Sequence, residues 1–442
     1  MDFPENLVSC IGLSISATSV ILYLTHYLPF KITPILLVVL YSACAVSSII
    51  AILHRKIKIR WSLDTPITLL LFTVVLFLRF YQAKDLVLPA WVDSVHHVLI
   101  TKVILEKGMV PSTLEPYLAV PFSYYFGFHG LAAAFSAISG LPPEKAVLIL
   151  GQILNACMPL AIYRLGRTIW TDRTRPVIAA LFVAFVSQMP AYYVTWGRYT
   201  LLTGMIMLAI AMAEMTDVHQ KPGRYRAALL CLIVFGLTLS HYFSALLFIL
   251  FTVLYLLNSY FKAGRHLTSM DLKAPLVISI AFLLLAPWLI RAYHLTGYSL
   301  DLEINFQTIN GGWQSIQAYA QYLFKLACPF RNYIFLSIGI LGIIPTVLNR
   351  QSRILAIWSI IILITSLPLG FKLPNIRPDH MNIILFFPLS LCAANLLVFS
   401  RDKISKYLPK KIIVAYIFSL PLIGFCIWGI IETRSIINPE TV

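Results

Sequence analysis

The amino-acid sequence predicts an all-α polytopic membrane protein, and its composition, hydropathy and charge distribution all indicate this class. Hydrophobic residues make up 59% of the 442 positions, charged residues only 12%, and the mean hydropathy is +0.83. A soluble protein carries roughly 25% charged residues, so this chain lacks the polar groups that a water-facing surface requires. The formal net charge is +16. We attribute this excess to orientation in the bilayer, and we expect no nucleic acid partner.

Long apolar stretches recur along the whole chain. A helix needs about 20 apolar residues to cross the hydrocarbon core of a bilayer. We therefore predict one integral membrane domain over residues 1–442, with no appended soluble domain and with about 13 transmembrane helices. The predicted spans lie near 7–28, 33–53, 65–82, 146–169, 176–194, 200–216, 226–240, 242–261, 274–294, 331–349, 353–370, 380–400 and 411–431.

The predicted domain has three parts. Residues 1–64 supply two extra N-terminal spans, residues 65–205 form a core whose first outer loop is 83–145, and residues 206–442 hold the remaining spans. The later outer loops are 295–329 and 371–380. The apolar run from 226 to 261 is predicted to form two helices with a turn near Ser240 and His241, since a single helix would move the later basic loops to the opposite side.

Basic residues collect in every second loop. Nearly all of the net positive charge lies in 54–60, 164–175, 217–226, 262–273, 349–353 and 401–411. Because positive loops face the cytoplasm, we expect a plasma-membrane protein with a cytoplasmic N-terminus. All six basic loops lie on the cytoplasmic side only if the short, glycine-interrupted segment 124–141 does not cross the bilayer. We therefore predict that it is an interfacial or re-entrant helix on the outer side.

The first outer loop contains WVDSVHH and a predicted amphipathic helix over 93–107, closed by Gly108 and Pro111. Asp93, His96 and His97 are spaced i, i+3 and i+4, which places them on one helix face. A carboxylate beside two imidazoles can abstract a proton, bind a metal ion or hold a phosphate. An alternative remains open, in which Asp93 only caps the helix and the histidines lie among lipid headgroups.

Other outer segments hold the remaining candidate residues. The aromatic segment MPAYYVTWGRY contains Arg198 and Tyr199, and an Arg there, beside Gly197, can bind a lipid phosphate or simply anchor the chain at the interface. The segment FKLPNIRPDHMN is predicted to be an irregular loop because it contains two prolines. Its cations suit a phosphate clamp, although Arg377 and Asp379 can also pair with each other. The outer candidates are completed by His129, His241, Arg331, Lys372 and His380.

The arrangement resembles the GT-C glycosyltransferase superfamily. An acidic residue, Asp93 in WVDSVHH, follows a span in the first large outer loop. Surface and re-entrant helices follow, over 93–107 and PFSYYFGFHGLAAAFSAISG, then an Arg-rich inner turn, YRLGRTIWTDRTRP, and an outer turn, MPAYYVTWGRY. The likeness is clearest over 65–205. It implies a GT-C-like fold and a polyprenyl-phosphate-linked sugar donor, with a glycan, lipid or protein as acceptor.

The resemblance also implies roles for individual residues. Asp93 is expected to act as the catalytic base of an inverting transfer on the extracytoplasmic side. The residues expected to bind substrate are His96, His97, His129, Arg198, Tyr199, His241, Arg331, Lys372, Arg377 and His380. A divalent metal ion stays an open alternative, and no metal ligands are assigned.

Other functions remain open. The chain also suits a polysaccharide polymerase or an O-antigen-ligase-like enzyme, a lipid-linked glycan transporter, or a non-catalytic assembly subunit. A transporter requires a polar path through the bilayer, which the predicted spans do not contain. The enzyme interpretation requires Asp93, His96 or His97, Arg198 and Arg377 to line one outer cavity. That geometry discriminates between the alternatives.

Overall fold

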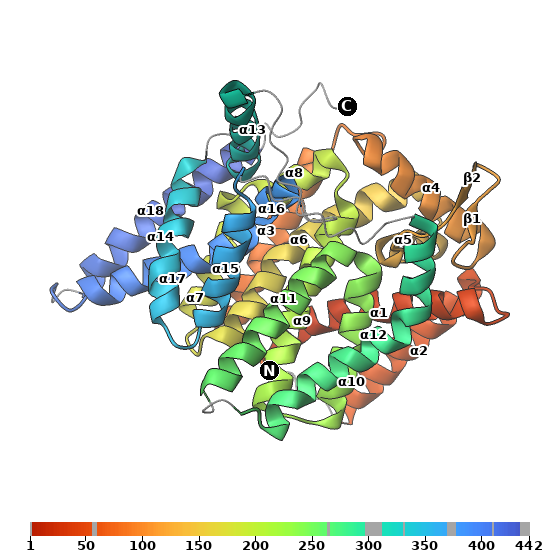
Figure 1. The fold of residues 1–442 in the computed structure, drawn as a ribbon, viewed down its shortest axis with the longest axis horizontal. Helices are drawn as coiled ribbons and strands as arrows, with labels where there is room; N and C mark the ends of the chain where they lie inside the picture. The colour runs from red at the N-terminus through yellow and green to blue at the C-terminus, as the bar shows by residue number, and fades with distance from the viewer. Residues whose placement is uncertain are drawn as a thin grey trace.

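The structure, a computed structural model, describes residues 2–54, 60–262, 266–296, 312–329, 332–368, 377–408 and 411–433. These residues form 18 α-helices, one π-helix and a two-stranded hairpin (Figure 1). The α-helices are α1 Phe3–Tyr27, α2 Pro34–Leu53, α3 Asp64–Gln82, α4 Val92–Lys107, α5 Gly127–Ser139, α6 Pro143–Ile169, α7 Thr174–Leu181, α8 Met189–Trp196, α9 Tyr199–Gln220, α10 Arg224–Ser240, α11 Tyr242–Lys262, α12 Ser269–Thr296, α13 Gly312–Ala327, α14 Tyr333–Leu348, α15 Arg353–Thr365, α16 Pro378–Ile384, α17 Phe386–Ile404 and α18 Lys411–Thr433. The π-helix η1 is Phe182–Val186, and the strands are β1 Thr113–Leu114 and β2 Leu118–Pro121.

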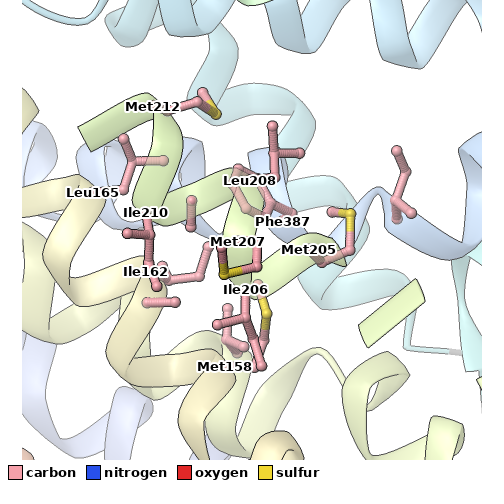
Figure 2. Packing of buried hydrophobic residues seen from close by; sticks show 14 of the residues in the cluster. Met158, Ile162, Leu165, Met205, Ile206, Met207, Leu208, Ile210, Met212 and Phe387 are labelled. Atoms are coloured by element: carbon pink, nitrogen blue, oxygen red, sulfur yellow. The ribbon is translucent and has the colours of Figure 1, made fainter. Parts of the chain in front are cut away.

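Helices α6 and α9 form the centre of the protein. Apolar side chains surround α9, and every residue from Met205 to Met212 is buried. A helix that is apolar on all sides belongs in the interior of a large helical protein. Figure 2 shows Met158, Ile162 and Leu165 of α6 packed close to the Met205–Met212 segment of α9. The other helices are therefore arranged around a rigid central pair.

Part of the span prediction is confirmed. Among the described residues, seven helices are long and apolar enough to cross a membrane, namely α1, α3, α6, α9, α11, α12 and α18, and the bent pair α16–α17 makes up to eight. The chain is therefore an all-α polytopic membrane protein with seven to eight candidate spans, and 13 crossings are not established. Each of the other predicted ranges contains a helix, but helices such as α14 and α15, with 16 and 13 residues, are too short to meet the length test.

Several local predictions are confirmed. The helix expected over 93–107 is α4, and it ends at Gly108, whose φ of +64° places it in the left-handed region. Helices α10 and α11 are separate, with extended backbone at His241 between them. Helix α5 occupies the segment predicted not to cross. It covers 13 residues, Gly127–Ser139.

The structure corrects three predictions. The span expected over 176–194 is interrupted at Gln188, whose φ is +62°: α7 continues directly into η1, which ends at Val186, and α8 begins at Met189. The span expected over 380–400 is bent by 44° between α16 and α17. Pro388 lacks the N–H that would bond back to Ile384 across this break. The first outer loop also contains β1 and β2, an antiparallel hairpin that the all-α prediction did not include.

Candidate functional site

A cavity of about 300 Å³ lies where several helix ends meet. We call it the Asp93 cavity. It is formed by the start of α4, the segment before α5, the start of α9, the α10–α11 junction and α16. The predicted site residues that line it are Asp93, His97, Arg198, His241 and His380. Side chains that are far apart in the sequence therefore meet at one place.

The close contact of two backbone segments places Arg198 beside Asp93. Gly197 ends α8 with a φ of +58° and packs so closely on α4 that an added Cβ would lie 2.2 Å from Ser94 Oγ. Arg198 Nη1 is 3.0 Å from Asp93 Oδ2. The two side chains are 36% and 39% exposed, so the ion pair faces the cavity instead of being enclosed in the protein.

Strained backbone precedes both segments. Trp91, just before α4, has a φ of +78°, and Gln188, just before α8, has a φ of +62°. Positive φ values are uncommon for bulky residues and cost of order 1–3 kcal/mol each. The surrounding packing therefore holds the chain in place on either side of the Asp93–Arg198 pair.

Two buried histidines support the inner wall. His97 Nδ1 and His129 Nε2 are joined by a hydrogen bond of 2.9 Å, and the side chains are 4% and 0% exposed. Burial lowers the pKa of His97 to about 4, and burial with the adjacent His97 lowers the pKa of His129 well below its usual value. Both rings are therefore neutral at neutral pH, and one N–H is shared between the facing nitrogens.

Aromatic and neutral polar groups complete the cavity. Tyr124 Oη donates to Tyr125 Oη over 2.6 Å, and the Tyr125 ring lies 4.7 Å from the His241 ring. Burial lowers the pKa of His241 to about 3, with smaller contributions from the nearby His380, Arg198 and His97. The described lining thus combines one ion pair with phenols and with the uncharged imidazoles of His97 and His241.

The remaining predicted residues lie elsewhere. His96 is exposed on α4, outside the lining. Tyr199 lies behind the cavity, with its ring 6.1 Å from that of His97 and stacked 5.4 Å from Phe128. Arg377 donates to both carboxylate oxygens of Asp379, at 3.0 and 2.7 Å, and does not line the cavity. Arg331 and Lys372 fall outside the described residues.

Several lining residues were not among the predicted site residues. They are Ser123, Tyr124, Tyr125, Thr200, Leu201, Tyr242, Phe243, Leu246 and Ile383. The Tyr124–Tyr125 doublet opens the glycine-interrupted segment 124–141, and Tyr242 directly follows His241. Only these positions in the sequence could have identified them as lining residues. The signal is weak, because aromatic residues are common at every membrane interface.

The cavity does not fit a divalent metal ion. Among the described residues, no group of three or more His, Cys, Asp or Glu is arranged to hold one. Asp93, the carboxylate of the described lining, is paired with Arg198, and His97 is bonded to His129. We therefore assign no step of the chemistry to a metal ion.

The fold is similar to that of solved membrane enzymes. The oligosaccharyltransferase AglB of Archaeoglobus fulgidus, in complex with an inhibitory peptide and a dolichol-phosphate, matches with a TM-score of 0.54 and 13% identity over 84% of this chain and 56% of that one. The same organism's enzyme tethered to an acceptor peptide matches with a TM-score of 0.53 and 12% identity over 83% and 55%. Its complex with Zn and sulfate matches with a TM-score of 0.53 and 13% identity over 82% and 53%.

These likenesses establish a shared fold. The chain spans about half the length of the enzymes it matches, and no curated protein matches it in sequence. A family described as a family of unknown function, DUF6541, matches residues 15–375, which is most of the chain. The chain therefore belongs to the DUF6541 family.

Proposed function

We propose that this protein is a GT-C-type membrane glycosyltransferase, which moves a sugar from a polyprenyl-phosphate-linked donor to an acceptor outside the cytoplasm. The supporting observation is the Asp93–Arg198 ion pair, which faces a cavity walled by tyrosines and neutral histidines. The fold shared with an oligosaccharyltransferase that was solved with dolichol-phosphate agrees with this assignment. The proposed acceptor is a glycan, a lipid or a protein.

In the proposed reaction, Asp93 takes the proton of an acceptor hydroxyl. The acceptor oxygen then forms a bond to the anomeric carbon, on the face opposite the phosphate, and the bond from that carbon to the phosphate oxygen breaks. The electron pair leaves with the lipid phosphate, and the configuration at the sugar is inverted. General base catalysis by a positioned carboxylate typically contributes about 10²–10⁴-fold.

Arg198 has the donors that a departing phosphate requires. One of its nitrogens is 3.0 Å from Asp93, while its Nε has no acceptor among the described residues. A guanidinium carries five N–H donors in a planar fork that suits phosphate oxygens. In the resting protein Arg198 pairs with Asp93, and in the proposed complex it shares its donors with the phosphate.

The neutral residues are proposed to bind the sugar. His241 and Tyr124 line the cavity near the ion pair, and their N–H and O–H groups can bond sugar hydroxyls without adding charge. His380 lines the same cavity and offers further ring nitrogens for these hydroxyls. The bonded His97–His129 pair holds the inner wall in position. The proposal retains the orientation expected from the basic loops, with about 13 crossings, a cytoplasmic N-terminus and this cavity on the outer side of the plasma membrane.

The test is sugar transfer by the purified protein, with a panel of short-chain polyprenyl-phosphate hexoses and pentoses as donors. Asp93→Asn removes the base while preserving shape, and we expect about 10³-fold slower transfer. The matched control is Asp85→Asn, in the same loop, because the Asp85 side chain is 76% exposed and forms an ion pair with the exposed Lys84 at 3.8 Å. Unchanged transfer by Asp93→Asn would refute the proposal.

A further inference from the structure

A second and larger cavity lies at the opposite ends of two helices that form the Asp93 cavity. Its volume is about 840 Å³. Helices α9 and α11 pack together (Figure 1) and contribute their first turns to the Asp93 cavity and their last turns to this one. Thr200 and Thr216 of α9 line the two cavities, and their separation is about 24 Å at the helical rise. The two cavities therefore lie near opposite faces of the membrane.

Four basic turns converge on this second cavity, which we call the basic cavity. It is lined by the end of α6, the end of α9, the end of α11 with the start of α12, and the turn between α14 and α15. These segments belong to the loops 164–175, 217–226, 262–273 and 349–353, all assigned to one face by their charge. Loops that are separate in sequence thus enclose one hollow.

Two of the charged side chains in the lining already have partners within the protein. Arg167 Nε is 2.9 Å from Glu5 Oε1. Asp271 accepts bonds from the backbone N and the Oγ1 of Thr268, at 2.8 and 2.5 Å, in a capping-box arrangement at the start of α12. It also lies 3.9 Å from His219 Nε2. These charges are held within the protein.

Lys262 and Arg350 are different. Both are exposed at the basic cavity, and neither has an ion pair with any described residue. The same cavity is lined by the neutral polar side chains of Asn258, Ser259, Gln220 and Gln351, and by the apolar side chains of Trp170, Phe251 and Leu355. The basic cavity therefore has two unmatched positive charges beside hydrogen-bonding groups.

We propose that the basic cavity binds a phosphate-bearing ligand through Lys262 and Arg350. An arginine fork and a lysine ammonium together match the several oxygens and the charge of a phosphate group. Basic pockets between helices at a membrane face commonly hold lipid headgroups. The phosphate belongs to an anionic lipid or to a soluble phosphorylated compound, and the apolar part of the lining can contact the rest of either molecule.

The experiment follows the unfolding temperature of the purified full-length protein in nonionic detergent. Dioctanoyl phosphatidylglycerol or inorganic phosphate is added in graded amounts at constant ionic strength. We expect at least one of them to raise the unfolding temperature of the wild type. In the double variant Lys262→Gln, Arg350→Gln, the half-saturating concentration should rise by at least about tenfold.

The matched control is Lys403→Gln, Lys406→Gln. Both of these lysines are exposed in the basic loop 401–411, which does not line the basic cavity. Its half-saturating concentration should stay within about twofold of the wild type, since only general surface charge is lost. Should the first double variant not fold, Arg350→Gln alone is expected to weaken binding about threefold or more.

The two added ligands distinguish the possible sources of the phosphate. Stabilisation by the lipid alone assigns the phosphate to a headgroup, and stabilisation by inorganic phosphate assigns it to a soluble compound. The proposal is overturned if neither ligand stabilises the wild type, or if both double variants lose binding equally. Sugar transfer is not measured and the Asp93 cavity is untouched, so this result is independent of the proposed function.

Discussion

The Asp93 cavity and the basic cavity lie at the two ends of α9 and α11, and they differ in whether their charged side chains are paired with each other. In the Asp93 cavity, the carboxylate and the guanidinium of the described lining pair with each other, and the buried histidines are neutral. In the basic cavity, Lys262 and Arg350 have no acidic partner among the described residues. The paired charges of the Asp93 cavity suit the proposed sugar transfer, and the unpaired cations of the basic cavity suit the proposed binding of an anion.

The direction of the helices favours this division. Helices α9 and α11 are parallel, with their N-termini at the Asp93 cavity and their C-termini at the basic cavity. A helix carries about half a positive charge at its N-terminus and half a negative charge at its C-terminus. The carboxylate of Asp93 therefore faces two positive helix ends, and the cations of the basic cavity face two negative ones.

The largest effect that separates the two cavities is expected from Arg198→Gln. Loss of a donor to developing negative charge typically costs about 10²–10³-fold in rate, so sugar transfer should fall by this factor. Stabilisation by added phosphatidylglycerol or inorganic phosphate should not change, since Arg198 lines only the Asp93 cavity. Loss of both properties in this variant would show that the cavities are not independent.

Acid should destabilise the protein through the Asp93 cavity. The pKa of His97 falls from its ordinary value near 6.5 to about 4 on folding, so the unfolded chain takes up the proton first. Stability that is present above pH 6.5 is therefore lost as the pH falls toward 4, by on the order of 3 kcal/mol. Denaturant unfolding in detergent between these pH values measures the slope.

Substitution identifies the source of this pH dependence. His97→Asn removes the buried titrating ring, so the fall in stability between pH 6.5 and 4 should become smaller. His96→Asn, at the exposed neighbouring position, should keep the wild-type slope. Equal slopes in the wild type and in His97→Asn would assign the acid sensitivity to other groups.

Gly197→Ala should produce a smaller effect of steric origin. The added Cβ would lie 2.2 Å from Ser94 Oγ and 3.1 Å from the backbone O of Ala90, at a φ of +58°. Gly140 provides the matched control, because its φ is +70° and nothing lies within 4 Å of an added Cβ. Gly140→Ala should cost only about 1 kcal/mol for the left-handed backbone.

The difference between the two alanine variants isolates the contact between α4 and the Gly197 turn. We expect Gly197→Ala to cost roughly 1–3 kcal/mol more than Gly140→Ala, as overpacking usually does, and to slow transfer because Arg198 moves away from Asp93. Thermal unfolding and transfer assays measure the two parts. Equal stability of the two variants would mean that the contact is loose.

Local features were predictable because their causes are local. The helical spacing of the apolar residues over 93–107, with Gly108 and Pro111 after them, predicted α4. The break at His241 and the short segment of α5 followed from length and charge. The division of 176–194 was not predictable in the same way, because η1 and the left-handed Gln188 arise from packing of the whole bundle.

The sequence by itself determined that this is a membrane protein, which of its loops are basic, and that its candidate site residues lie outside those loops. Composition and periodicity decide these properties, and both can be read along one chain. Only the tertiary structure decided which side chains meet. Asp93 forms an ion pair with Arg198 because the neighbouring Gly197 packs closely against Ser94. Four basic turns enclose one cavity because α6, α9 and α11 end close together. Such contacts depend on packing between segments that are far apart in the chain, and local sequence patterns do not predict that packing.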